Sequence, residues 1–249
     1  MKKILLIIAI FSLTACGPNE EDFKSDVPIG APIEAPIGAP IGAPIGAPME
    51  LQSEINLDVT FFPQAPDADW GMPWQEACEE AASTLAYYYA SDKPLTKDEF
   101  KSEIQGLVEW ENKNFGDYKH TNIAQTAEMI KGYFGYSDFE IINNPTVEQI
   151  KEELAKGNII IAPFAGRQLG NPFYSGEGPL YHMMVLKGYD EKYFITNDVG
   201  TKRGQNFIYP YSIIMSAMHE WHDGDMNLGA KKVIVLKPLS PAGGTETEK

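Results

Sequence analysis

Residues 72–90 read MPWQEACEEAASTLAYYYA and contain Cys78, the only cysteine beyond the first sixteen residues of the chain. Alanine, leucine and aromatic side chains follow Cys78 at helical spacing, so this stretch predicts a helix that begins at the cysteine. A thiol at that position lies near unpaired backbone N–H groups and the positive end of the helix dipole, which both stabilise a thiolate. Glu79 and Glu80 oppose this effect unless they point away along the helix.

The next segment, 96–114, predicts an amphipathic helix. Thr96 and Glu99 have the spacing of a capping box, in which each residue pairs with the backbone N–H of the other. One face of this helix is apolar and carries Phe100, Ile104, Leu107 and Trp110. Such a face is expected to pack against the rest of a core.

The remaining elements follow the same signals of capping and periodicity. Further helices are expected at 121–136, at 146–158 and, between the last two strands, at 209–221. Short apolar and β-branched runs bounded by Gly, Asp and Asn predict strands at 158–164, 181–190, 192–198 and 231–238. Helices first and strands later predict an α+β domain with a mostly antiparallel sheet.

The chain begins with a signal for export. Two lysines precede an apolar run that is too short to span a bilayer, which predicts a signal peptide over 1–15. The sequence LTAC at 13–16 resembles the lipobox of bacterial lipoproteins. That resemblance implies that Cys16 is lipidated and anchors the chain in the bacterial cell envelope, facing outside the cytoplasm. An ordinary cleaved signal peptide with an incidental cysteine is the alternative.

A low-complexity segment separates this anchor from the domain. Residues 27–50 repeat units such as APIG, and a proline in every fourth position blocks helices and sheet ladders. We therefore expect a lipidated anchor and proline-rich linker at 16–50, one domain at 51–238 and a disordered tail at 239–249.

The charge of the chain restricts its partners. The formal net charge is -15 at pH 7. Binding to nucleic acid requires a basic face that neutralises phosphates, and no such face is evident, so nucleic acid is not an expected partner. An acidic chain is also repelled by anionic lipid, so membrane attachment should depend on the lipid at Cys16 alone.

Lipidation of Cys16 leaves Cys78 without a partner for a disulfide bond. An unpaired cysteine in an exported chain is either a reactive thiol or a small buried hydrophobic residue. A reactive thiol needs a proton-transfer partner, and His182 follows a loop rich in Gly and Pro at the start of a predicted strand.

A hairpin would bring His182 next to Asp198. If the chain turns at Asp190 and Glu191, the two residues lie eight positions on either side of Asp190 and face one another. The carboxylate could then hold the imidazole in position to protonate a leaving group and pair with a thiolate. Asn197 is the alternative orienting residue, although alternation along a strand lets only one of the two side chains face His182.

Several stretches together also resemble a known family. They are PWQEACEEAA at 73–82, GRQLGNPFYSGEGPLYHMMVLKGYD at 166–190, FITNDVGTKRG at 194–204 and HEWHDGD at 219–225. In this order, over 58–237, they resemble the C39-like cysteine peptidases of the papain-like group. The resemblance implies a papain-like fold whose cysteine helix packs on the sheet that carries the histidine.

The resemblance also implies roles for individual residues. Cys78 would be the nucleophile that attacks an amide bond of a peptide or protein substrate, His182 the general acid and base, and Asp198 the orienting residue. Gln75 would donate to the oxyanion, although it lies closer to its cysteine than the glutamine of papain does. The backbone N–H of Cys78, at a helix start, is a further donor.

Aromatic residues flank both halves of this predicted site. Trp74 and Tyr181 are expected to contact the substrate, with core packing as the other explanation. His219 and His222 are three residues apart but lack a third ligand, so no metal or other cofactor is predicted.

The predicted function is that of a membrane-tethered cysteine hydrolase acting outside the cytoplasm. Three alternatives remain: a transglutaminase-like acyl transferase, which uses the same order of Cys, His and Asp; a cell-wall amidase; and a binding domain that kept the scaffold without turnover.

Overall fold

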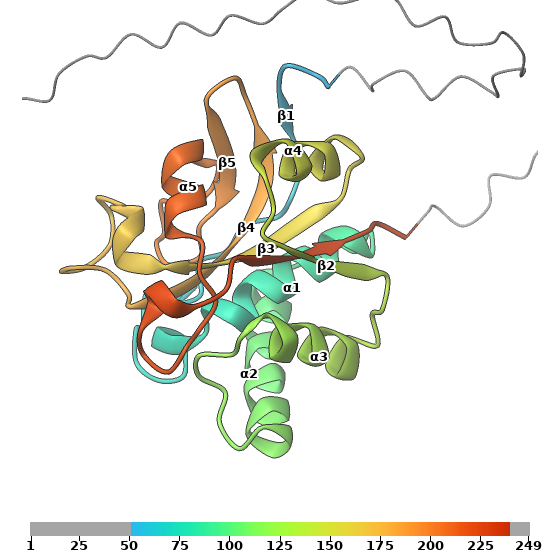
Figure 1. Ribbon diagram of the computed structural model, residues 1–249. Coiled ribbons are helices and arrows are strands. Elements are labelled where there is room, and N and C mark those ends of the chain that lie inside the picture. The colour runs from blue at the N-terminus through green and yellow to red at the C-terminus, as the bar shows by residue number, and fades with distance from the viewer. Residues whose placement is uncertain (1–50, 240–249) are drawn as a thin grey trace, which may run out of the picture. The chain divides into compact units, whose positions relative to one another are not determined.

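The computed structural model describes residues 51–239, which form a seven-stranded sheet with five α-helices (Figure 1). The predicted signal peptide at 1–15, the lipidation site Cys16, the linker at 16–50 and residues 240–249 of the predicted tail lie outside the described residues. Within the described part of the chain, no helix is both long enough and apolar enough to cross a membrane.

The helices are α1 (Cys78–Ala90), α2 (Lys97–Asn114), α3 (Ile123–Phe134), α4 (Val147–Ala155) and α5 (Tyr211–Ala217). The strands are β1 (Ile55–Asn56), β2 (Phe139–Asn143), β3 (Ile159–Ala165), β4 (Tyr181–Tyr189), β5 (Tyr193–Asn197), β6 (Phe207–Pro210) and β7 (Lys232–Leu236). The sequence predicted α1 to α4 and the strands β3, β4, β5 and β7 near these positions. It missed β1, β2 and β6. The helix expected at 209–221 is shorter at both ends, because β6 extends to Pro210 and the helix stops at Ala217.

The strands form one sheet in the order β2-β7-β3-β4-β5-β6, with β1 paired to β4. Every pair of neighbours is antiparallel. The prediction of an α+β domain with a mostly antiparallel sheet is therefore confirmed. Helices cover both faces, which explains why every residue of β3 and β4 is buried.

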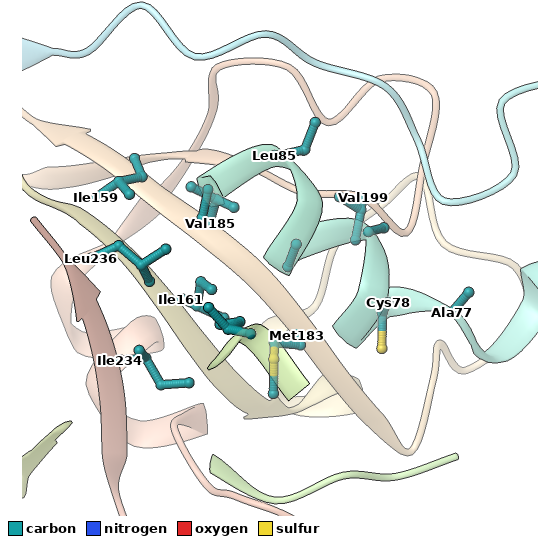
Figure 2. Packing of buried hydrophobic residues seen from close by; sticks show 14 of the residues in the cluster. Ala77, Cys78, Leu85, Ile159, Ile161, Met183, Val185, Val199, Ile234 and Leu236 are labelled. Carbon is teal, nitrogen blue, oxygen red and sulfur yellow. The ribbon is translucent and has the colours of Figure 1, made fainter. Parts of the chain in front are cut away.

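The helix that begins at Cys78 packs on one face of the sheet, against β3, β4 and β7 (Figure 2). Its alanines Ala81, Ala82 and Ala86 are completely buried, and side chains this small let the helix approach the strands closely. Leu85 of the same helix is also buried, and burying a leucine contributes about 1.5–3 kcal/mol to the free energy of unfolding. A second cluster, with α4 and α5, covers the opposite face.

Helix α2 has the predicted capping box and most of the predicted apolar face. The Thr96 hydroxyl accepts from the Glu99 backbone N–H, and the Glu99 carboxylate accepts from the Thr96 N–H over 2.8 Å. Phe100, Ile104 and Leu107 are completely buried. Trp110 is only half-buried, and the buried position one turn after Leu107 belongs to a carboxyl residue, Glu111, which faces α1.

Candidate active site

Cys78 is the first residue of α1, and its side chain is nearly buried, with 6% of its surface exposed. The Sγ–H group donates a hydrogen bond to Oε2 of Glu79 over 2.9 Å. Burial and the charge of Glu79 raise the pKa of the Cys78 thiol well above its ordinary value, against the smaller opposite effect of the Met183 backbone N–H. Figure 2 shows Cys78 and Met183 at the place where α1 meets the sheet.

Two sequence-based expectations about this thiol are wrong. Glu79 does not point away from the cysteine along the helix, because its carboxylate is buried and contacts Sγ, whereas Glu80 does point away and faces Glu111. The helix start was expected to favour a thiolate, yet burial of the sulfur and, after it, the carboxylate of Glu79 raise the pKa of the thiol. These surroundings favour the neutral thiol over the thiolate.

His182, the second residue of β4, forms a buried pair with Asp198. Its Nε2 atom lies 2.8 Å from Oδ1 of Asp198, so the predicted contact is present. The predicted register is wrong, however, because Val185 pairs with Asn197 and a bulge follows Leu186. Asp198 therefore lies diagonally across from His182, a separation that side chains of this length span.

The carboxylate of Asp198 accepts hydrogen bonds on both oxygens. Oδ1 accepts from His182 and from the Gly200 backbone N–H at 3.0 Å. Oδ2 accepts from Asn171 Nδ2 at 2.9 Å, the Tyr174 hydroxyl at 2.7 Å and the Tyr209 hydroxyl at 2.6 Å. Burial alone would raise the pKa of Asp198, but the charge and hydrogen bond of His182, together with the two hydroxyls, lower it to about 2.

Asn197 points elsewhere and does not contact the histidine. Its amide donates to the Val59 carbonyl over 3.2 Å, and its own carbonyl accepts from the Asn206 N–H over 3.3 Å. Of the two candidates for the orienting residue, Asp198 is therefore the one that contacts His182.

Gly200 allows the histidine to lie this close to the loop after β5. A Cβ atom added at this position would meet His182 Cε1 at 2.9 Å, and real Cβ atoms do not approach other atoms so closely. The loop can therefore donate its N–H to Asp198 only if residue 200 has no side chain.

Cys78 and His182 both line one cavity of about 810 Å³. Its walls are aromatic at Trp70, Phe173, Tyr174 and Tyr181, and polar at residues that include Gln64, Gln75, Glu76, His120 and Lys202. Trp70 and Phe173 are each 41% exposed, so they form an accessible rim instead of a packed core. Pockets of this size and mixed lining are typical of sites that bind small molecules or short peptide segments.

Two of the three predicted substrate-contact or oxyanion residues line this cavity. Tyr181 lines the cavity, and its hydroxyl donates to the Thr121 carbonyl over 2.8 Å. Gln75 also lines the cavity and is exposed. Trp74 does not: its ring packs against the core cluster beneath α1, and Trp70 stands at the cavity instead. Three residues separate the two tryptophans across a tight turn, and sequence spacing alone does not reveal which ring points outward.

Sequence reasoning missed several residues around the site. Gln64 holds the turn before Cys78 by donating to the carbonyls of Trp74 and Gln75 over 2.9 and 3.0 Å. His120 lines the cavity and stacks on Trp221, with ring centroids 4.1 Å apart. These residues lie far from Cys78 and His182 in the chain, and no local pattern marked them.

No metal centre is evident in the part of the chain that the structure describes. Within residues 51–239, no group of three or more His, Cys, Asp or Glu side chains could hold a metal ion. Nδ1 of His219 instead lies 2.7 Å from the Gly229 carbonyl oxygen.

A comparison with protein families identifies the family to which a chain with this site belongs. The Peptidase_C39 like family matches residues 56–222, which is more than half of the chain and includes Cys78, His182 and Asp198. The chain belongs to this family. The resemblance to C39-like peptidases that the sequence motifs suggested is thus confirmed, and the family indicates a peptidase.

A solved structure agrees with the fold of this C39-like domain. A crystal structure assigned as a C39-like peptidase from Bacillus anthracis superposes with a TM-score of 0.51 and 14% sequence identity, covering 75% of this chain and 98% of that chain. At this identity the likeness establishes the fold of the C39-like domain and nothing finer. No curated protein matches the chain.

Proposed function

We propose that this C39-like domain is a cysteine hydrolase that cleaves amide bonds in peptide or protein substrates. The observation that carries the proposal is the shared cavity, which is lined by both Cys78 and His182, the residue whose ring Asp198 holds. A nucleophile, an oriented imidazole and a substrate-sized cavity are the three parts that acyl transfer to a cysteine requires.

The proposed reaction has two stages. Sγ of Cys78 attacks the amide carbonyl, and the backbone N–H of Cys78 and the Gln75 amide stabilise the oxyanion. His182 protonates the leaving amine, and Asp198 holds its ring in position through Nε2. Water then hydrolyses the thioester and restores the enzyme.

We assign substrate contact to Tyr181 and, in place of Trp74, to Trp70. Both line the cavity, and Trp70 is the more exposed of the two tryptophans at this turn. An exposed aromatic rim offers a side chain of the substrate apolar area without burying a charge.

The test is a cleavage assay on the purified protein with a mixture of unstructured peptides, in which mass spectrometry detects new termini. We expect cleavage that disappears in Cys78→Ala and after treatment with iodoacetamide. Cleavage that survives in Cys78→Ala, or none by the native protein on peptides and unfolded proteins alike, would contradict a cysteine peptidase.

The same assay distinguishes the alternative functions. Conjugates formed with an added primary amine would indicate an acyl transferase, and release of peptides from purified peptidoglycan would indicate a cell-wall amidase. An unreactive Cys78 without any turnover would indicate a binding domain on the same scaffold.

We also propose that the chain is tethered to the bacterial cell envelope by a lipid on Cys16, facing outside the cytoplasm. The proposal is supported by the LTAC sequence after the apolar run. Expression in a bacterial host with an alkynyl fatty acid should label the native chain, and Cys16→Ala should remove the label. A native chain that stays unlabelled, or a labelled Cys16→Ala chain, would contradict the lipid anchor.

A further inference from the structure

The proton on Cys78 has one acceptor in the structure. Sγ donates to Oε2 of Glu79 over 2.9 Å, and within residues 51–239 no other acceptor for this thiol proton is found. The buried surroundings of the cysteine favour the neutral thiol. A neutral thiol is a weak nucleophile, so a base must remove its proton during attack.

The carboxylate of Glu79 is held firmly in place. Glu79 is only 1% exposed, and its other oxygen, Oε1, accepts from the Thr121 backbone N–H over 3.1 Å. Within the described residues it forms no ion pair with a lysine or an arginine. A buried carboxylate without a lysine or arginine partner is costly, and groups kept in that state are candidates for proton transfer.

The pKa of the Glu79 carboxyl also lies near neutral pH. Burial raises its pKa to about 7, although the hydrogen bonds of Cys78 and Thr121 and the charge of His182 all act in the opposite direction. A base whose pKa lies near neutral pH can both accept a proton and return it, which is what a catalytic cycle requires.

His182 is placed for a different task. Its Nε2 atom is engaged by the Asp198 carboxylate, and within residues 51–239 no hydrogen bond joins either ring nitrogen to Sγ of Cys78. An imidazolium has two N–H donors and no acceptor, so in that form it cannot take the proton of a thiol. Its Nδ1 atom has no hydrogen-bond partner within residues 51–239 and is free to donate to a leaving group in the cavity.

We propose that Glu79 is the general base that deprotonates Cys78, while His182 serves as the acid for the leaving amine. This inference rests on the proposed function, because it assumes that Cys78 is the nucleophile. In a thiolate–imidazolium pair, a single histidine performs both proton transfers. Here Glu79 would accept the thiol proton and His182 would donate a proton to the amine.

The protons balance over one turnover. As the C–S bond forms, the thiol proton moves to Oε2 of Glu79, and as the C–N bond breaks, imidazolium His182 protonates the amine. Neutral His182 then takes a proton from the attacking water. The thiolate leaves the hydrolysed acyl group and recovers its proton from Glu79, so both residues return to their starting states.

Other titratable groups also surround Glu79. They are Cys78 and Glu80 on α1, Glu111 on α2, Tyr118 after α2, and Tyr181 and His182 on β4. Glu80 is the natural control, because it is the next residue, is equally buried and faces Glu111 instead of the sulfur. A variant at Glu80 makes the same chemical change without touching the thiol.

The experiment measures the rate of Cys78 alkylation by iodoacetamide against pH in the full chain. The iodide that leaves in this reaction needs no proton from an acid. The alkylation rate therefore reports removal of the thiol proton, and not protonation of a leaving group by His182. The native protein should show a rise in rate centred near about pH 7, as Glu79 becomes charged. Glu79→Gln should lose this rise and react about tenfold more slowly, or slower still, at about pH 8, whereas Glu80→Gln should follow the native profile.

The histidine variant gives the opposite pattern. His182→Gln should keep the rise near about pH 7 and an alkylation rate within about a factor of two of native, yet lose peptide hydrolysis. This comparison also decides the matter if Glu79→Gln does not fold, which its melting temperature will reveal.

Three results would overturn the inference. Faster alkylation of Glu79→Gln at about pH 6–7 would mean that the carboxylate only suppresses the thiolate. An unchanged profile would mean that it takes no proton, and loss of the rise in His182→Gln would make His182 the base. The proposed function fails separately, if the alkylation pattern holds but no amide is cleaved in a Cys78-dependent manner.

Discussion

Asp198→Asn is expected to lower kcat/KM for amide hydrolysis by about 10³-fold, a loss comparable to that of a general acid. Asparagine keeps the shape of the side chain but replaces one acceptor oxygen with an NH2 donor. That donor would face either the ring of His182 or the hydroxyls of Tyr174 and Tyr209, which all donate to the carboxylate in the native protein. Steady-state kinetics at about pH 7, with a melting curve for each variant, is the measurement.

Asn197→Ala is the matched control for this prediction. Asn197 joins β5 to the segment at Val59 and does not contact His182, so its loss should lower the melting temperature but leave the folded protein active. A folded Asp198→Asn protein with more than about a tenth of native activity would show that the carboxylate does not orient the ring.

Glu111→Gln is expected to stabilise the domain at alkaline pH. Glu80 and Glu111 are completely buried where α1 meets α2, and within the described residues no lysine or arginine donates to their four oxygens. Burial raises the pKa of Glu111 to about 8, aided by the charge of Glu79 and opposed by the hydrogen bond from Glu80. Burial and the charges of Glu111 and Glu79 also raise the pKa of Glu80 well above its ordinary value.

The sign of the pH dependence follows from these raised values. A carboxyl whose pKa is higher in the folded state contributes stability that is fully present below its unfolded pKa, near 4.5 for Glu111, and is lost as pH rises through the folded value of about 8. Each pKa unit corresponds to about 1.4 kcal/mol, so the native free energy of unfolding should fall by about 2–4 kcal/mol between about pH 5 and 8.5. In Glu111→Gln the amide removes one of the two titrating groups and can donate to Glu80, so the fall should be much smaller.

Thermal unfolding at several pH values measures this effect. At about pH 8.5 the melting temperature of Glu111→Gln should exceed that of the native protein by about 5–10 °C, with little difference at about pH 5. Glu109→Gln, which changes an exposed glutamate of the same helix, should follow the native curve. Parallel pH dependences of the native and Glu111→Gln proteins would mean that the pair does not titrate between these values.

Local signals were sufficient for the helices and for the long strands. The caps at Thr96, Asn122 and Thr146 are each formed by side chains three residues from their partners, so the sequence alone specifies where those helices begin. The strands β3 and β4 are runs of apolar residues whose burial could be anticipated. The short strands β1 and β6 carry no such signal, because β1 has two residues and β6 ends in Pro210; each is a strand only through pairing with a neighbour.

The same division holds within the candidate site. By itself, the sequence determined that Cys78 starts a helix, that His182 lies near the start of a strand and that Asp198 lies at the end of the next one, since capping, periodicity and turn residues act over a few positions. Only the tertiary structure decided that Asp198 meets the histidine diagonally past a bulge, that Trp70 and not Trp74 borders the cavity, and that Glu79 lies buried on the thiol. Those outcomes depend on how α1 is seated against the sheet and the 117–121 segment, and packing between distant segments leaves no periodic trace in the chain.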